Sequence, residues 1–266
     1  MTSASGMPHP APQTAESPAA PAAGALAAPT ADALVGPAPR RSYLYVPGNR
    51  PERFPKAQNA GADAIILDLE DAVPLAEKAA ARAAACGFLA SDSAARGPDI
   101  FVRINPPQSR VGLADLLALT DLERPAPTAW RGLLLPKVET PETLHLVDAL
   151  LTEAGLPLEV AALLETAAGI ERAGEIAAAG PRLSALMFGG ADLAADLGVA
   201  LAWDPLVFAR ARLVQAAAMH GKAAVEMPWV ALDDAAGYRD DLTRSFALGF
   251  TARAAIHPRQ IAAIHA

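Results

Sequence analysis

Residues 61–73 of the 266-residue chain read GADAIILDLEDAV: a glycine, then a short apolar run, then a group of acidic residues. An apolar run of this length is typical of a strand that is buried on both faces, as in a parallel sheet. Seven other runs of the same kind occur along the chain, and longer helix-like stretches separate them. Because parallel neighbours need a crossover helix, this alternation predicts a parallel sheet covered by helices.

The expected elements form eight strand–helix units. The strands are expected at residues 42–46, 63–69, 100–104, 132–135, 158–164, 183–188, 222–226 and 250–256, and the helices at 51–60, 76–90, 111–119, 141–154, 167–179, 205–220, 233–248 and 258–265. Eight units without a glycine-rich dinucleotide-binding loop favour a (β/α)8 TIM barrel over the alternative, a doubly wound open sheet. The prediction is a single-domain barrel over residues 41–266.

The first forty residues differ from the rest in composition. Residues 1–40 contain eight prolines and thirteen alanines, and they have almost no large apolar side chains. Such a segment buries too little surface to offset the entropy of ordering it, so we expect a disordered Ala/Pro-rich tail. It has neither the basic start nor the apolar stretch of a secretory signal.

Composition excludes several classes of function. The 22 basic and 29 acidic residues give a net charge of −7, which is unsuited to coating nucleic acid or an anionic membrane. A single cysteine, Cys86, excludes an intramolecular disulfide and a cysteine-built zinc site. No apolar run is long enough to span a membrane. We expect a protein of the reducing cytoplasm.

Charged residues cluster at the carboxyl ends of the expected strands, the rim where a TIM barrel carries its active site. The acidic residues there are Asp68, Glu70, Asp71, Glu165, Asp192 and Glu226, with Arg103 and Lys137 among them. Carboxylates that converge on one rim repel one another unless a cation lies between them. A set of oxygen ligands favours a hard ion, and the sequence therefore predicts a Mg²⁺ site.

Glu165 and Asp192 follow adjacent expected strands, so they can share one ion. Gly189 and Gly190 would let a substrate carboxylate approach backbone N–H groups, and Arg103 is suited to a bidentate grip on that carboxylate. These features predict an anionic, oxygen-rich substrate.

Each of these residues also has a purely structural interpretation. Glu165 could be a buried carboxylate paired with an arginine, Asp192 a helix cap, and Arg103 the partner of Asp68 or Glu70 in an ion pair. Lys137 is the one candidate for Schiff-base chemistry, but nearby carboxylates raise the pKa of a lysine, which favours an electrostatic role.

Seven motifs in order make the chain resemble the HpcH/HpaI aldolase/citrate lyase family, and most of all its citrate lyase β-subunit branch. The motifs are RSYLYVPG at 41–48, GADAIILDLEDAV at 61–73, VRIN at 102–105, LPKVE at 135–139, LETA at 164–167, FGGADL at 188–193 and IHPRQI at 256–261. The resemblance implies a metal-dependent barrel that forms a homotrimer or homohexamer. It also implies that Arg41 and the loop over residues 47–53 lie near the thioester or coenzyme A entrance.

The resemblance implies roles for individual residues. Glu165 and Asp192 would ligate Mg²⁺, and Arg103 would bind the substrate carboxylate together with the turn at Gly189 and Gly190. Glu70 and Asp71 would lie around the metal, with Asp71 the best candidate for the acid or base. Longer relatives carry a C-terminal lid that supplies an acidic catalytic residue to a neighbouring subunit. The chain ends at Ala266, so we expect this lid to be lacking.

The expected function is that of a Mg²⁺-dependent carbon–carbon lyase. It would cleave a β-hydroxyacyl thioester of the citryl, citramalyl or malyl type to an oxo acid and an acyl thioester, with coenzyme A or an acyl carrier protein as the carrier. Two alternatives remain open: a class II pyruvate aldolase, and a catalytically silent barrel that serves as a subunit of a complex.

Overall fold

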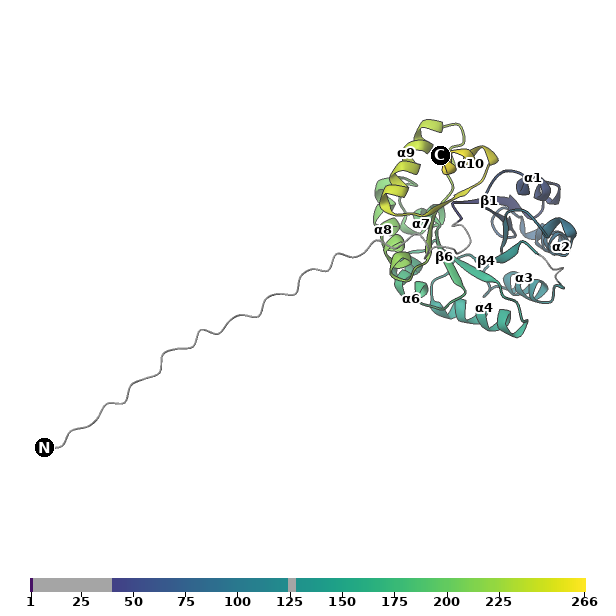
Figure 1. Ribbon diagram of the computed structural model, residues 1–266, viewed down its shortest axis with the longest axis horizontal. Helices are drawn as coiled ribbons and strands as arrows, with labels where there is room; N and C mark the ends of the chain where they lie inside the picture. The colour runs from purple at the N-terminus through teal and green to yellow at the C-terminus, as the bar shows by residue number, and fades with distance from the viewer. Residues whose placement is uncertain (2–39, 124–127) are drawn as a thin grey trace. The chain divides into compact units, whose positions relative to one another are not determined.

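The computed structural model describes residue 1 and residues 40–123 and 128–266. Within these residues, eight parallel strands form a closed barrel in chain order, and the last strand pairs with the first (Figure 1). The strands are β1 (Ser42–Pro47), β2 (Ala64–Asp68), β3 (Asp99–Arg103), β4 (Trp130–Leu135), β5 (Glu159–Leu164), β6 (Leu183–Phe188), β7 (Ala223–Glu226) and β8 (Ala252–Ala255). The predicted TIM barrel is confirmed.

Helices surround the strands, as Figure 1 shows. They are α1 (Phe54–Gln58), α2 (Lys78–Leu89), α3 (Arg110–Thr120), α4 (Pro141–Glu153), α5 (Ala167–Glu171), α6 (Ala173–Ala177), α7 (Gly190–Leu197), α8 (Trp203–Met219), α9 (Ala235–Leu248) and α10 (Ile261–His265), with short 3-10 turns at Pro51–Arg53, Leu75–Glu77, Asp92–Ala94 and Pro258–Gln260. None of the helices in the described ranges is both long and apolar enough to cross a membrane.

The strands are buried on both faces, which explains why their sequences are mainly apolar. All five residues of β2 are buried. Ile66 packs inside the barrel with Phe101 and Leu163, whereas Ile65 and Leu67 belong to the larger core between the strands and the helices. Removal of both faces from water stabilises the sheet without any need for polar residues in its strands.

The helices expected at 51–60 and 258–265 each begin with a 3-10 turn, and two larger differences from the sequence prediction occur elsewhere. The stretch expected as one helix over 167–179 is divided into α5 and α6, because Arg172 leaves the helical conformation. Helix α7 was not expected: it has only eight residues, begins after Gly189 and ends at Gly198, whose φ is 67°. A short helix that begins with glycines shows no clear hydrophobic period in the sequence, so it is difficult to predict. This helix nevertheless carries Asp192.

Arg40 lies at the amino-terminal end of the barrel. Its guanidinium donates to Asp99 at 2.6 Å and to both oxygens of Glu159 at 2.9 Å, and it lies 5.1 Å from the centre of the Phe101 ring. Arg40 therefore belongs to the compact unit Arg40–Ala266. The rest of the predicted tail, apart from Met1, lies outside the described residues.

A buried carboxylate fixes the loop that follows β3. Asp115 of α3 is fully buried, and its Oδ2 accepts hydrogen bonds from the backbone N–H of Asn105 at 3.0 Å and from its side-chain amide at 2.6 Å. Its other oxygen accepts from Arg82 Nε at 2.7 Å. Asp115 thus ties α2 and α3 to the segment directly after Arg103.

Replacement of Asp115 by alanine is expected to destabilise the barrel. The change leaves the Arg82 guanidinium and the Asn105 amide without their partner, and breaking a buried pair from one side costs about 3 kcal/mol. Urea unfolding followed by circular dichroism measures this loss. The exposed Asp121→Ala is the control and should change the free energy of unfolding by less than about 0.5 kcal/mol. Equal stability of the two variants would contradict this role for Asp115.

Candidate active site

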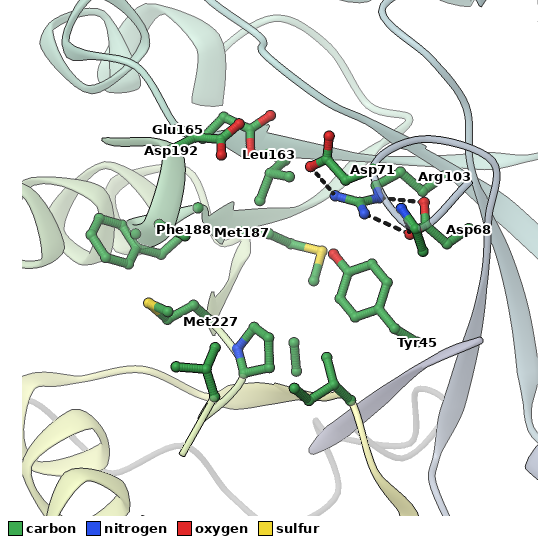
Figure 2. Close-up of a pocket in the computed structure, with 18 of the residues that line it drawn as sticks. Tyr45, Asp68, Asp71, Arg103, Leu163, Glu165, Met187, Phe188, Asp192 and Met227 are labelled. Carbon is green, nitrogen blue, oxygen red and sulfur yellow. Dashed lines mark hydrogen bonds and ion pairs between the residues drawn. The ribbon is translucent and has the colours of Figure 1, made fainter. Parts of the chain in front are cut away.

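A pocket of about 400 Å³ opens at the carboxyl ends of the strands. Figure 2 shows its two kinds of wall: Asp68, Asp71, Arg103, Glu165 and Asp192 supply charged groups, and Tyr45, Leu163, Met187, Phe188 and Met227 supply mainly apolar surface. The polar residues come from the ends of several different strands. The rim that the sequence predicted for the chemistry is the rim that carries the pocket.

Glu165 directly follows β5 and lies in the barrel mouth with 3% of its surface exposed. Its Oε1 accepts a hydrogen bond from the backbone N–H of Lys137 at 2.9 Å. A side chain at position 189 would place its Cβ 2.3 Å from the Cβ of Glu165, so only glycine fits there. Burial raises the pKa of Glu165 to about 8; the Lys137 ammonium opposes this shift, and the charges of Asp192 and Glu70 add to it.

Asp192 lies in the first turn of α7, where the helix dipole favours a negative charge. Its side chain is 40% exposed and its Oδ2 lies 3.1 Å from Lys137 Nζ. Gly190, at the start of the same helix, packs against Met227: a Cβ there would lie 2.4 Å from the methionine sulfur. Close packing thus fixes the start of the helix that brings Asp192 to the pocket beside Glu165 (Figure 2).

Lys137 connects three of the acids. Its Nζ lies 3.1 Å from Glu70 Oε1, 3.1 Å from Asp192 Oδ2 and 4.0 Å from Glu165 Oε1. Partial burial lowers the pKa of Lys137, but the hydrogen bond to Asp192 and the charges of Glu70 and Glu165 outweigh burial, and its pKa lies above the ordinary value. A Schiff-base lysine needs a lowered pKa, so these contacts favour the electrostatic role.

Arg103, at the end of β3, uses one edge of its guanidinium for a structural ion pair. Its Nε and Nη2 donate to the two oxygens of Asp68 at 2.7 and 2.6 Å, and its plane lies over the Tyr45 ring at 4.9 Å. The remaining nitrogen, Nη1, lies 3.0 Å from Glu70 Oε2 and 3.6 Å from Asp71 Oδ2. The ion pair with Asp68 is therefore present and occupies the fork, and Nη1, which faces Glu70 and Asp71, is the one terminal nitrogen that Asp68 does not hold.

Glu70 and Asp71 are neighbours in sequence with different surroundings. Glu70 is buried between Arg103 and Lys137; burial raises its pKa, the Arg103 charge opposes this shift and Asp71 adds to it. The Asp71 side chain is 58% exposed and lines the pocket. Of this pair, Asp71 has the access to solvent and pocket that proton transfer requires.

The residues present fit a magnesium ion. Among the described residues, no group of three or more His, Cys, Asp or Glu side chains is arranged to hold a metal. Mg²⁺, however, usually takes only one or two protein carboxylates and completes its octahedron with water and substrate oxygens. Glu165 and Asp192 supply two carboxylates, and the Lys137 ammonium between them shows that this place accommodates positive charge.

Two other polar residues of the rim do not join this cluster. Glu226 is fully buried, and it accepts hydrogen bonds from Arg210 Nε at 2.8 Å and from the backbone of Met227. His257 caps the final 3-10 turn by accepting from the backbone N–H of Arg259. Sequence reasoning missed Tyr45, which supports Arg103. The alternation of Tyr43 and Tyr45 along β1 places both rings toward the barrel interior, and this signal could have indicated it.

Comparison with known proteins gives concordant results. The family model described as HpcH/HpaI aldolase/citrate lyase matches residues 41–258. A citrate lyase subunit beta-like protein of Deinococcus radiodurans is 36% identical over 234 residues, which cover 86% of this chain and 80% of that protein. An L-malyl-CoA/beta-methylmalyl-CoA lyase of Cereibacter sphaeroides is 34% identical over 254 residues, which cover 84% of this chain and 77% of that protein. A (3S)-malyl-CoA thioesterase of the same species is 37% identical over 226 residues, with coverage of 84% and 75%.

Solved structures agree. RipC from Yersinia pestis superimposes with a TM-score of 0.73 at 37% identity, over 85% of this chain and 93% of that one. The citrate lyase beta subunit of M. tuberculosis, complexed with oxaloacetate and magnesium, gives a TM-score of 0.69 at 34% identity, with coverage of 85% and 96%. CitE of Mycobacterium tuberculosis with magnesium, acetoacetate and coenzyme A gives 0.70 at 35% identity, with coverage of 85% and 80%.

The raised pKa of Glu165 predicts how the stability of the metal-free protein depends on pH. In the unfolded chain this carboxyl ionises near its ordinary pKa of 4.5, whereas in the folded protein it keeps its proton up to about pH 8. Between these values the folded state binds more protons than the unfolded state. The free energy of unfolding should therefore fall as the pH rises through this window and then level off.

Urea unfolding in EDTA across this pH range measures the effect. Glu70 and Glu226 have pKa values raised in the same direction, so the contribution of Glu165 is the difference between the native protein and Glu165→Gln. The native protein should lose on the order of 1–3 kcal/mol more than the variant as the pH rises. Parallel curves would show that Glu165 ionises normally.

Proposed function

The chain belongs to the HpcH/HpaI aldolase/citrate lyase family, and on this premise we propose that it is a Mg²⁺-dependent carbon–carbon lyase. The proposed substrate is a β-hydroxyacyl thioester of the malyl, citramalyl or citryl type, cleaved to an oxo acid and a shorter acyl thioester. Coenzyme A is preferred to an acyl carrier protein as the carrier, because relatives named malyl-CoA lyase and a neighbouring structure with coenzyme A support it.

The observation that carries the proposal is the division of the pocket into two walls. Glu165 and Asp192 lie within 4.0 Å of one cation, Lys137 Nζ, while Arg103 stands at the same pocket. This charged wall suits the carboxylate and oxygen atoms of a small oxo acid. The wall of Leu163, Met187 and Phe188 suits an acyl chain. A hydroxyacyl thioester presents both kinds of surface.

Glu165 and Asp192 would hold the magnesium ion. When bound, the ion would polarise the substrate oxygen that becomes the keto group, which is Lewis-acid catalysis. Arg103 would orient the substrate carboxylate through Nη1, because Asp68 already fixes the other edge of the guanidinium. The backbone at Gly189 and Gly190 would approach the same carboxylate from α7.

Cleavage requires a proton to leave the substrate hydroxyl and a proton to reach the carbon of the thioester that the broken bond releases. We assign the proton transfer to Asp71, which combines access to the pocket with a place 3.6 Å from Arg103 Nη1. Glu70 is held from both sides by Arg103 and Lys137. Its proposed part in catalysis is to position these two cations.

One second candidate has support from the comparisons. The (3S)-malyl-CoA thioesterase shares 37% identity with this chain, and hydrolysis of the thioester would use the same carboxylate and acyl contacts. The two reactions differ in their products: the lyase forms an oxo acid without free thiol, and the thioesterase forms free coenzyme A without an oxo acid.

The test is a product assay on the purified full chain with Mg²⁺. Malyl-, methylmalyl-, citramalyl- and citryl-coenzyme A are each supplied, and both oxo acid and free thiol are measured. Oxo acid formation that EDTA abolishes supports the lyase. Thiol release alone supports the thioesterase. Turnover only with pyruvate and an aldehyde would indicate the aldolase, and no turnover in any arm would indicate a silent barrel.

Substitutions in the proposed metal and carboxylate sites should separate their roles. Glu165→Gln and Asp192→Asn each leave one anionic ligand, so Mg²⁺ binding and activity should fall by roughly a hundredfold or more. Arg103→Lys keeps the charge but loses both the fork that Asp68 holds and the Nη1 that this fork orients, so oxo-acid affinity should fall while Mg²⁺ still binds. Calorimetry with Mg²⁺ and with oxaloacetate measures both.

The matched control for Asp192 is Asp196→Asn, one turn further along α7, where the carboxylate accepts from the backbone of Ala167. It should retain Mg²⁺ binding. Normal Mg²⁺ and oxo-acid binding in Glu165→Gln, Asp192→Asn and Arg103→Lys together would place the site elsewhere.

Asp71→Asn should lower kcat by about 10² to 10⁴-fold, the usual contribution of a general acid or base. Asparagine keeps the shape of the side chain and cannot transfer the proton. Binding of Mg²⁺ and oxo acid should remain, because Asp71 is not among their proposed ligands. Steady-state kinetics and calorimetry on the same preparation check this, and an unchanged kcat would remove Asp71 from the mechanism.

A further inference from the structure

Lys137 contacts both carboxylates of the proposed metal site, one through its backbone N–H and the other through its side-chain ammonium. Its backbone N–H donates to Glu165 Oε1 at 2.9 Å, and its Nζ lies 3.1 Å from Asp192 Oδ2. The same Nζ reaches Glu70 Oε1 at 3.1 Å. The ammonium therefore occupies the centre of the three carboxylates that a divalent cation would also seek.

The backbone at Lys137 indicates that this placement is specified. Its φ is 52°, and it is the one non-glycine residue with positive φ in the described ranges. A lysine in the left-handed region is unfavourable by itself and persists where its surroundings require it. Here the left-handed turn after β4 goes together with both contacts: the backbone N–H to Glu165 and the side chain to Asp192.

The ammonium and a divalent ion cannot both keep these contacts. A magnesium ion at Glu165 and Asp192 would place two positive charges beside the lysine, and like charges at such distances repel strongly. The Lys137 side chain is 40% exposed, and its flexible stem gives the ammonium a way out toward solvent while Glu70 can remain its partner. Arg103 cannot move in this manner, because Asp68 holds it by two hydrogen bonds.

We propose that Lys137 is a built-in counter-ion that competes with the divalent cation. In the metal-free protein its ammonium pairs with Asp192 and Glu70 beside the buried Glu165, and these contacts keep the mouth of the barrel ordered. When the metal binds, the Lys137 ammonium loses its contact with Asp192. The inference rests on the proposed function for the identity of the metal site, and it adds a residue that sets the affinity of that site by opposing the metal.

The test measures metal binding and stability, without turnover. Lys137→Met removes the competing charge, so it should bind Mg²⁺ roughly tenfold or more tightly than the native protein in calorimetry. Mn²⁺, followed by the electron paramagnetic resonance signal of the free ion, gives the second measurement. In EDTA the same variant should melt at a lower temperature, because Glu70 and Asp192 then lose the ammonium that lies 3.1 Å from each of them. Saturating Mg²⁺ should raise its Tm by more than it raises that of the native protein.

Three matched variants complete the design. Lys137→Asn is also neutral, and asparagine tolerates positive φ, so it guards against a folding defect in Lys137→Met. Lys137→Arg keeps the charge and should bind the metal no more tightly than the native protein. Lys222→Met removes one positive charge just before β7, where Nζ contacts only the carbonyl of Gly180 among the contacts described, and should leave metal affinity unchanged.

The outcomes separate this inference from the proposed function. Tighter metal binding in Lys137→Met and Lys137→Asn, but not in Lys222→Met, supports the counter-ion. Unchanged or weaker binding in both neutral variants, beside normal binding in the native protein, overturns the counter-ion and leaves the proposed function intact. Failure of every protein to bind Mg²⁺ or Mn²⁺ overturns both.

Discussion

The mouth of this barrel depends on how buried carboxylates are neutralised. Closing eight parallel strands brings all their carboxyl ends to one rim, and in this chain four of the groups that meet there are the acids Asp68, Glu70, Glu165 and Asp192. Carboxylates this close are tolerated only with cations among them. Arg103 and Lys137 meet that requirement from β3 and from the turn after β4: Arg103 contacts Asp68 and Glu70, and Lys137 contacts Glu70, Glu165 and Asp192.

Arg103 and Lys137 make different kinds of contact because a guanidinium and an ammonium differ in shape and flexibility. A guanidinium can bind one carboxylate with one edge and present another nitrogen elsewhere, which is how Arg103 pairs with Asp68 and still reaches Glu70. An ammonium is a compact point charge on a flexible stem, and Lys137 gathers three acids around it. The rigid cation suits recognition, and the mobile one suits exchange with a metal.

Most of the fold could be predicted from the sequence because its strands are buried on both faces and therefore appear as apolar runs such as AIILD in β2. Helix α7 could not, because eight residues opened by glycines have no clear period. Asp192 was nevertheless placed correctly at the rim, since its position after β6 depends on the strand and not on the helix.

The sequence indicates which residues line the site more readily than it indicates the contacts between them. Charge and position at a strand end pointed to Arg103 and Glu165, but nothing in the sequence reveals that Asp68 uses two of the arginine's nitrogens. Nor does a sequence show that Lys137 has a positive φ or that its backbone N–H donates to Glu165. Side-chain geometry of this kind is decided by packing between strands that are distant in sequence.

Because Asp68 and Tyr45 hold the plane of Arg103 in place, the pocket has a handedness. The guanidinium, the pair Glu165 and Asp192, and the apolar wall form three different anchor points that do not lie on a line (Figure 2). A tetrahedral carbon that carries a carboxylate, a hydroxyl and a chain meets all three points in only one of its mirror images. Under the proposed function, the fixed arginine would therefore make the barrel a chiral template that distinguishes the two enantiomers of such a substrate before any bond is broken.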